Sequence, residues 1–290
     1  MNIVDILDEH NIAYNVRGDW YNVCCPFCLH DTGYHLGISN KGYATCFKCG
    51  WHSMQTVLAA LLDCGYDHAR SLARRLYSNE AYMPVQYATN DFKLPSSGKL
   101  SGVAFEYFSD RMGAYYTTED LNALVDSYDL RYTAYDYPDY MYAGRIVFPN
   151  KLNGKAVSYQ CRDYMGIHNT KYITAGKDQE LVFHKNFLWG IDHVPYNKVI
   201  VCEGVMDALT IGAGAVHTHG VRWTTSQAAE LMCFDEVYIC YDSDSAGMLG
   251  ARDLARNICH RAKVKVVRIS AKDVNSCSKS EVEDLRALIN

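Results

Sequence analysis

The chain has 290 residues, with 28 lysines and arginines against 33 aspartates and glutamates, and a formal net charge of −5. Its 49% hydrophobic and 21% charged residues are typical of a globular protein, which excludes a disordered chain, a fibre and a generally basic, histone-like binder of nucleic acid. The length predicts two or three domains, each with its own core.

The start of the chain shows no secretory signal, and its longest aliphatic run, 57–62, is far too short to cross a membrane. We therefore expect a cytoplasmic protein that does not contact a membrane. In a reducing cytosol the 12 cysteines are expected to be metal ligands or small buried side chains rather than disulfides.

Residues 1–78 are predicted to form the first domain. A short amphipathic start is followed by a section rich in cysteine, glycine and aromatic residues, and then by a helical run from Ser53 to Tyr77 in which apolar residues recur at helical spacing. Residues 79–100 contain two prolines and the sequence Ser-Ser-Gly, which predicts a linker.

Residues 101–195 are predicted to form a second domain that begins with two helices, at Ala104–Met112 and Thr118–Asp126. Strands are expected at Arg145–Pro149 and Ala156–Asp163, joined by a turn that contains Asn-Gly.

This second domain is divided by charge. Residues 101–144 hold two basic and eight acidic residues, whereas residues 145–185 hold seven basic and three acidic ones. A local basic segment suits the binding of phosphates, although exposed lysines are also ordinary surface residues. The acidic total of the chain therefore does not exclude a nucleic-acid substrate.

Residues 196–290 are predicted to form a third domain in which strands and helices alternate. The strands are expected at Lys198–Cys202, Ala213–His217, Val237–Tyr241 and Val264–Ile269, and the helices at Val205–Ile211, Ser226–Cys233 and Gly247–His260. This alternation predicts a parallel sheet with helices on its faces, an α/β unit within a chain that is mixed α+β overall.

Four cysteines follow the pattern Cys25-x2-Cys28-x17-Cys46-x2-Cys49. Two such pairs at this separation are typical of a zinc site, and four thiolates leave no position open to substrate, so we predict one structural Zn²⁺. The alternative is four buried free cysteines. Cys24 adjoins the first ligand position, and three nearby histidines are alternative ligands: His30, His35 and His52.

Aromatic and basic residues surround these cysteines. Such a mixture suits the binding of single-stranded nucleic acid, and it equally suits the small core of a zinc ribbon.

Acidic residues follow two of the predicted parallel strands. Glu203 comes directly after one strand, and Asp242 and Asp244 come after another. The carboxyl ends of parallel strands meet at one edge of a sheet, so these carboxylates are expected to converge there as ligands of Mg²⁺ or Mn²⁺. Without a metal, at least one of their pKa values should rise. The alternative is that each acid caps a helix or stabilises a turn.

Taken in order, these motifs resemble the DnaG-type primases of bacteria and phages. Segments along nearly the whole chain carry the resemblance: the two cysteine pairs, Arg145-Ile-Val-Phe-Pro149, Lys171-Tyr-Ile-Thr, Phe183-His-Lys185, Val199–Asp207 and Tyr241–Gly247. The last two are similar to the signature blocks of a Toprim domain. The resemblance implies an N-terminal zinc ribbon followed by a two-part polymerase core that ends in a Toprim-like domain.

The implied activity is that of a DNA primase, a DNA-directed RNA polymerase that makes short RNA primers de novo from ribonucleoside triphosphates on single-stranded DNA during replication. The resemblance implies catalytic metal ligands at Glu203, Asp207, Asp242, Asp244 and Asp273. It also implies that four basic residues hold nucleotide, template or primer, with the two lysines in catalytic roles: Arg145, Arg162, Lys171 and Lys185.

The sequence departs from the family in three places. Cys28 occupies a ligand position that is usually His in the bacterial enzymes. Asp273-Val-Asn275 keeps one carboxylate of an Asp-x-Asp block, which leaves the number of catalytic metals open. The chain stops at Asn290 without room for a helicase-binding domain, so we expect a separately encoded replicative helicase as partner and an origin in a phage or mobile element. The alternative functions are a Toprim nuclease or topoisomerase and a non-enzymatic binder of single-stranded DNA.

Overall fold

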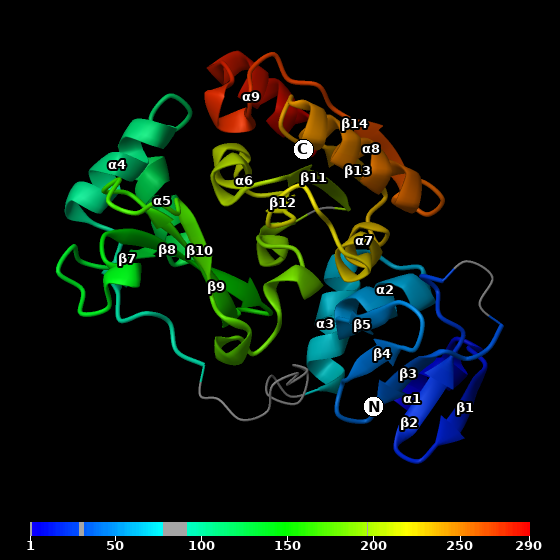
Figure 1. Cartoon of the computed structure of the whole chain (residues 1–290). Helices are drawn as coiled ribbons and strands as arrows, with labels where there is room; N and C mark the ends of the chain where they lie inside the picture. The colour runs from blue at the N-terminus through cyan, green and yellow to red at the C-terminus, as the bar shows by residue number, and fades with distance from the viewer. Residues whose placement is uncertain (1, 29–31, 78–91, 196) are drawn as a thin grey trace.

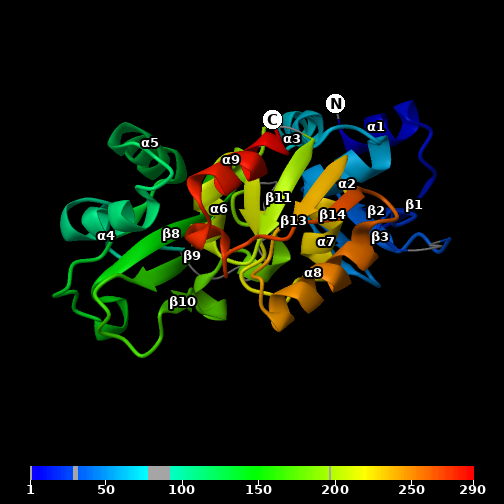
Figure 2. The same ribbon diagram turned by 90° about the horizontal axis from the view of Figure 1, so that it is seen from above.

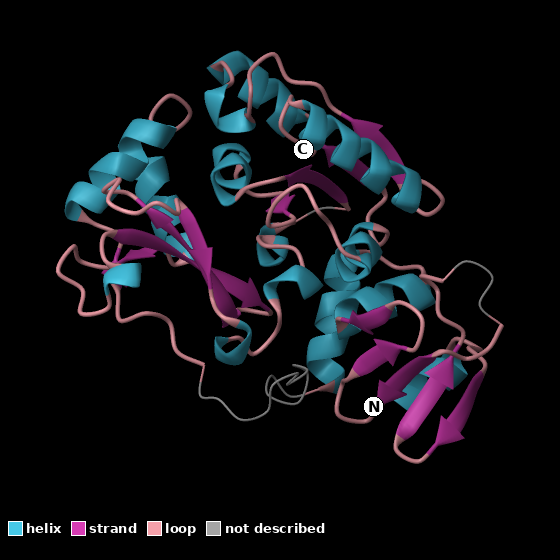
Figure 3. Cartoon of the chain, viewed as in Figure 1, coloured by secondary structure: helices cyan, strands magenta, loops and turns pink. Residues whose placement is uncertain are grey.

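The computed structural model describes residues 2–28, 32–77, 92–195 and 197–290. Three β-sheets succeed one another along these described residues, each with its own helices (Figure 1, Figure 3). The mixed α/β fold predicted from the sequence is confirmed. Among the described residues, no helix is long and apolar enough to span a membrane.

The first sheet is antiparallel, with its five strands in sequence order. Its strands are β1 (Tyr14–Arg17), β2 (Trp20–Val23), β3 (Leu36–Ser39), β4 (Ala44–Cys46) and β5 (Gly50–His52), and its helices are α1 (Ile3–Glu9), α2 (Met54–Leu62) and α3 (Tyr66–Leu76). The continuous helical run predicted from Ser53 to Tyr77 is wrong at one point. Asp63 ends α2 in the left-handed region, with φ of 48°, so α3 begins again after Gly65.

The second sheet is also antiparallel, in the order β10-β9-β8-β7-β6. Its elements are β6 (Gly98–Lys99), α4 (Gly102–Met112), α5 (Thr118–Tyr128), β7 (Arg131–Tyr132), β8 (Arg145–Leu152), β9 (Lys155–Asp163) and β10 (Tyr172–Thr174). The predicted turn joins β8 to β9 through Asn153 and Gly154, whose φ values of 56° and 80° are those of a hairpin turn. Residues 79–91 of the predicted linker lie outside the described residues.

The third sheet is parallel, as predicted, and its strands lie in the order β12-β11-β13-β14. Its elements are β11 (Lys198–Cys202), α6 (Val205–Ile211), β12 (Ala215–His217), α7 (Thr225–Leu231), β13 (Glu236–Ile239), α8 (Ser245–Ile258), β14 (Lys263–Val266) and α9 (Lys279–Ala287). Alternate residues of β11 enter two separate cores: Val199 and Val201 pack with α7 and α8, and Ile200 and Cys202 pack with α6 and α9 (Figure 2).

The two cores join the parallel sheet to the other two units. The cysteine-rich unit packs against α7 and the segment after it. Ser226 Oγ in α7 donates to the carbonyl of Trp51 at 2.7 Å, and the ring of Phe234, beyond the end of α7, stacks on that of Tyr66 at 5.3 Å. On the opposite face, the Tyr116 hydroxyl donates to the carbonyl of Leu209 in α6 at 2.9 Å. The second unit and the parallel sheet therefore share a buried core.

Candidate functional site

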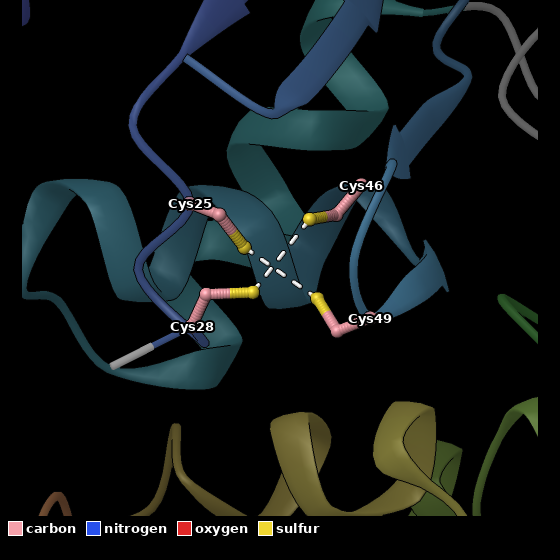
Figure 4. Close-up of side chains that lie close together, drawn as sticks. All are labelled: Cys25, Cys28, Cys46 and Cys49. Atoms are coloured by element: carbon pink, nitrogen blue, oxygen red, sulfur yellow. Dashed lines mark hydrogen bonds between the residues drawn. The ribbon is translucent and has the colours of Figure 1, made fainter. Parts of the chain in front are cut away.

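The four predicted zinc ligands converge at the end of the first sheet (Figure 4). The sulfurs of Cys25 and Cys49 lie 3.6 Å apart, and those of Cys28 and Cys46 lie 3.7 Å apart. A tetrahedral zinc with bonds of about 2.3 Å would space its sulfurs by about 3.8 Å, so the four cysteines fit the ion. Within the described ranges, no other group of three or more cysteine, histidine or acidic residues places all its ligand atoms within 4.8 Å of one another.

The structure also separates these ligands from the alternatives. Cys24 is exposed and stands outside the cluster. His52 is buried with Nε2 3.0 Å from the sulfur of Cys49, so it contacts a ligand without joining the group. The cluster excludes His35, and His30 lies outside the described residues. A hydrogen bond between Cys25 and Cys49 lowers the pKa of Cys25 and raises the pKa of Cys49. The two thiols are thus close enough to share one proton, which a bound zinc would displace.

The carboxylates meet at one edge of the parallel sheet because β11 and β13 are neighbouring parallel strands. Glu203 follows the last residue of β11, and its Oε1 accepts a hydrogen bond from the backbone N–H of Asp242 at 3.1 Å. A Cβ atom at Gly247 would lie 2.6 Å from this Oε1 and even closer to the carbonyl oxygen of Asp242. The glycine therefore leaves room for the two acidic residues to approach α8.

A cavity of about 370 Å³ separates this edge from the second sheet. Its acidic wall consists of Glu203, Asp207, Asp242 and Asp273, and its basic residues are Arg111, Arg162, Lys171 and Lys272. The cavity therefore brings four predicted metal ligands opposite two of the predicted basic site residues.

Burial is the main cause of the raised pKa values at the acidic wall. It raises the pKa of Glu203 to about 7, with the nearby charge of Asp242 as the second cause. It also raises the pKa of Asp207 to about 7, helped by the charges of Asp242 and Asp273. The predicted rise in at least one carboxylate pKa is confirmed. A hard divalent cation would relieve this repulsion, and carboxylate oxygens are the ligands that Mg²⁺ and Mn²⁺ prefer. No three of these carboxylates have oxygens within 4.8 Å of one another, so they would have to move closer together to bind one ion jointly.

The remaining predicted metal ligand, Asp244, is exposed and does not line the cavity. Its Oδ1 accepts from the N–H of Gly247 at 2.8 Å and caps α8, which was the structural alternative for this residue.

Asn275, the departure from the family's third acidic block, connects three elements. Its Nδ2 donates to the carbonyl of Arg111 at 3.1 Å and to Thr210 Oγ1 at 2.9 Å, and its Oδ1 accepts from the Arg111 guanidinium. Its backbone N–H donates to Asp207 Oδ1 at 3.1 Å. An aspartate at this position would have no N–H for the first two bonds. The amide thus ties α4 to α6 beside the acidic wall.

Arg162 is held rigidly on the basic side. Its guanidinium lies over the rings of Tyr107 and Tyr172, 5.6 and 5.1 Å from their centroids, and its Nε donates to the Tyr107 hydroxyl at 2.8 Å. The charge of Arg162 is the first cause that lowers the pKa of the exposed Lys171. Positive charges are therefore crowded together here, which favours an anion between them.

Two other predicted basic residues point elsewhere. Arg145 is 2% exposed, and its guanidinium donates to three carbonyls, those of Met141, Thr170 and Lys171. Lys185 Nζ donates to the carbonyls of Thr218, His219 and Arg222 at 2.7–3.0 Å, and burial lowers its pKa to about 8. Both side chains hold segments that border the cavity, Arg145 the one with Lys171 and Lys185 the one with His219.

The sequence patterns missed two cationic residues of the cavity. Lys272 directly precedes Asp273, so the third acidic block gave a signal for it. Arg111 lies in the acidic segment 101–144 and had no local signal, because its place depends on the packing of α4 against the third domain.

Comparison with known proteins finds one family and several solved structures that this chain resembles. Residues 200–278 match a family described as Toprim-like. No curated protein sequence matches the chain. The solved structures that it resembles include an Aquifex aeolicus primase with zinc-binding and RNA polymerase domains, at 20% identity and a TM-score of 0.47, over 100% of this chain and 83% of that one.

Two further structures are similar at lower scores. The primase fragment of the bacteriophage T7 primase-helicase protein has 16% identity and a TM-score of 0.41, over 92% of this chain and 97% of that one. A DnaG catalytic core has 19% identity and a TM-score of 0.42, over 68% and 63%. The family match spans the acidic edge described above, so residues 200–278 of this chain are similar to a Toprim-like domain.

Proposed function

We propose that this chain is a DNA primase, which synthesises short RNA primers de novo on single-stranded DNA during replication. One observation carries the proposal. A single cavity brings the basic side chains Arg162, from the second sheet, and Arg111, from α4, together with the carboxylates at the edge of the parallel sheet, within the residues that match a Toprim-like family. Such a cavity suits a substrate with several phosphates, because the phosphates need positive side chains around them and the accompanying metal ion needs carboxylates.

In the proposed reaction, the 3′-hydroxyl oxygen of one ribonucleotide bonds to the α-phosphorus of the next, the bond to pyrophosphate breaks and the hydroxyl proton passes to solvent. Arg111, Arg162 and Lys171 bind and orient the triphosphate, and Arg162 does so without reorganisation because two tyrosines fix it. Arg145 and Lys185 act as positioning residues, since their donors are bonded to backbone carbonyls.

The acidic residues that line the cavity would hold Mg²⁺ or Mn²⁺: Glu203, Asp207, Asp242 and Asp273. The bound ion supplies charge neutralisation at the reacting phosphate oxygens. Between reactions, the raised pKa values of Glu203 and Asp207 allow these carboxyls to hold protons in place of the cation.

The proposal extends to the rest of the chain. Residues 1–78 are the zinc-binding domain with one structural Zn²⁺, 79–100 the linker, 101–195 the basic part of the polymerase core and 196–290 its Toprim part. The zinc-binding domain would contact the template, and a replicative helicase would deliver that template in the cytoplasm of a bacterial cell, with a phage or mobile element as the source of the chain.

The substitution Asp242→Asn tests the proposal because it removes one charge and keeps the side-chain shape. Purified protein is incubated with single-stranded templates of varied sequence, labelled ribonucleotides and Mg²⁺ or Mn²⁺. We expect labelled RNA from the wild type and from Asp253→Asn, an exposed carboxylate on α8 outside the cavity, and none from Asp242→Asn. If the wild type makes no RNA but cuts or relaxes supercoiled plasmid without nucleotides, the primase proposal is wrong and the chain is a Toprim nuclease or topoisomerase.

A further inference from the structure

A second cavity, of about 250 Å³, borders the acidic loop that follows β13. Tyr241 and Ser243 line this second cavity, whereas Asp242, between them in sequence, lines the larger one. Successive side chains of an extended segment point to opposite sides, so the same short loop forms a wall of both cavities. A chain-like ligand that leaves the larger cavity across this loop reaches the smaller one.

The lining of the second cavity combines two arginines with apolar side chains. Arg252 and Arg268 contribute the charge, and Met248, Val267 and Ile269 contribute the apolar surface. Met248 and Arg252 are four residues apart on α8, so they share one face of the helix. Arg268 and Ile269 follow the end of β14, which packs against α8.

Both arginines are free to bind a ligand. Both are exposed, and no hydrogen bond or ion pair connects either guanidinium to another residue that the structure describes. By contrast, the buried arginines of the site have their donors engaged, Arg145 with carbonyls and Arg162 with tyrosine hydroxyls. Two guanidinium groups without partners beside an apolar surface suit a phosphate attached to a flat or apolar group.

The size of the cavity selects among such ligands. Pockets that enclose a whole small molecule usually measure about 300–1,000 Å³, and about 250 Å³ falls below this range. A single nucleotide unit of a longer strand needs no complete enclosure, because its neighbours along the strand add their own contacts. The shared loop also places the cavity next to the proposed reaction site, where a strand is present.

We propose that this cavity binds one phosphodiester-linked nucleotide of a single strand that crosses loop 242–244, with its phosphate on Arg252 and Arg268 and its sugar or base on the apolar side chains. The inference rests on the proposed function for the presence of a strand, and it adds a binding position outside the catalytic cavity. Phosphate contacts of this kind carry no sequence preference.

Binding of labelled 12-mers of deoxythymidine and of uridine tests the proposal, at several salt concentrations and without nucleotides or divalent metal. Each phosphate contact contributes about 0.7 to the slope of log K against log salt for a single strand. The double variant Arg252→Ala/Arg268→Ala, which removes both arginines from that one phosphate, should therefore reduce the slope by about 0.7 and bind more weakly at low salt. Arg256→Ala, on α8 but outside the cavity, should match the wild type.

The DNA and RNA probes show whether the bound strand is the template or the RNA product. Weaker binding of the DNA probe alone identifies the template, weaker binding of the RNA probe alone identifies the product, and either result supports the proposal. Arg252→Lys/Arg268→Lys, which keeps both charges, should retain most of the slope and guards against a folding defect in the alanine variant. Unchanged slopes and affinities in the folded alanine variant would overturn the proposal, and so would free uridine monophosphate that displaces the 12-mers at equal concentration.

Because this measurement requires no catalysis, its outcome is independent of the proposed activity. A wild type that makes no RNA but shows the arginine-dependent slope refutes the primase and supports the strand-binding cavity. If the wild type makes RNA while the alanine variant binds normally, the result supports the primase and refutes the strand-binding cavity.

Discussion

Gly247 gives the sharpest test of the geometry at the acidic edge. Alanine at this position improves the helix propensity of α8 by about 1 kcal/mol. Its Cβ, however, would lie 2.6 Å from Glu203 Oε1 and closer still to the backbone oxygen of Asp242, and overpacking of this kind costs about 1–3 kcal/mol. The clash should therefore outweigh the propensity, with a net loss of about 1 kcal/mol of folding stability.

The functional effect of Gly247→Ala should be larger than the effect on stability. Relief of the clash requires movement of the Glu203 carboxylate or the Asp242 backbone, and a displacement of about 1 Å at a reacting centre costs on the order of 100-fold in rate. Primer synthesis by the variant, measured at a temperature where urea titration shows it folded, should fall by about that factor.

Gly176→Ala is the matched control. Gly176 has a φ of −67°, and its added Cβ would come no closer than 3.5 Å to any neighbour, so this variant should behave as the wild type. If Gly247→Ala were as active and as stable as the wild type, the close approach of Glu203 and Asp242 to α8 would be refuted.

Two further changes test the rest of the molecule. Burial raises the pKa of Glu230 to about 8 from 4.5, so the folded state retains a proton that the unfolded state has lost. The free energy of unfolding should fall by a few kcal/mol as the pH rises from about 4.5 to 8, and Glu230→Gln should remove this decline in urea titrations at each pH; parallel profiles would contradict the shift. Cys46→Ser should abolish zinc binding and unfold the first sheet, whereas Cys24→Ser should keep one zinc per chain by metal analysis; zinc retained in Cys46→Ser would exclude the four-cysteine site.

Much of the secondary structure followed from the sequence alone. β11 and α6 have the bounds that the apolar pattern predicted, and the hairpin between β8 and β9 turns at the predicted Asn-Gly. These features depend on side-chain periodicity and on the conformational freedom of a few residues, both of which are local. The break between α2 and α3 was missed because a left-handed aspartate has no strong local signal.

The candidate site also combines features that the local sequence predicted with features that it did not. Spacing alone identified the four cysteines that cluster, and position at strand ends identified Glu203 and Asp242, because both signals follow from the direction of the chain at a knuckle or a sheet edge. Sequence reasoning did not reveal the engagement of Arg145 and Lys185 with backbone carbonyls.

Only the tertiary structure decided which charges face the cavity. Arg111 and Lys272 lie in it, and Asn275 ties α4 to α6 beside it. These places depend on how α4, the second sheet and the parallel sheet pack together, and residues that meet there are separated by up to 164 positions in the chain. The sequence by itself determined the types of chemical group available and the strand ends that carry the acids. Long-range packing determined which of those groups meet, because a side chain's partners depend on contacts that no local pattern encodes.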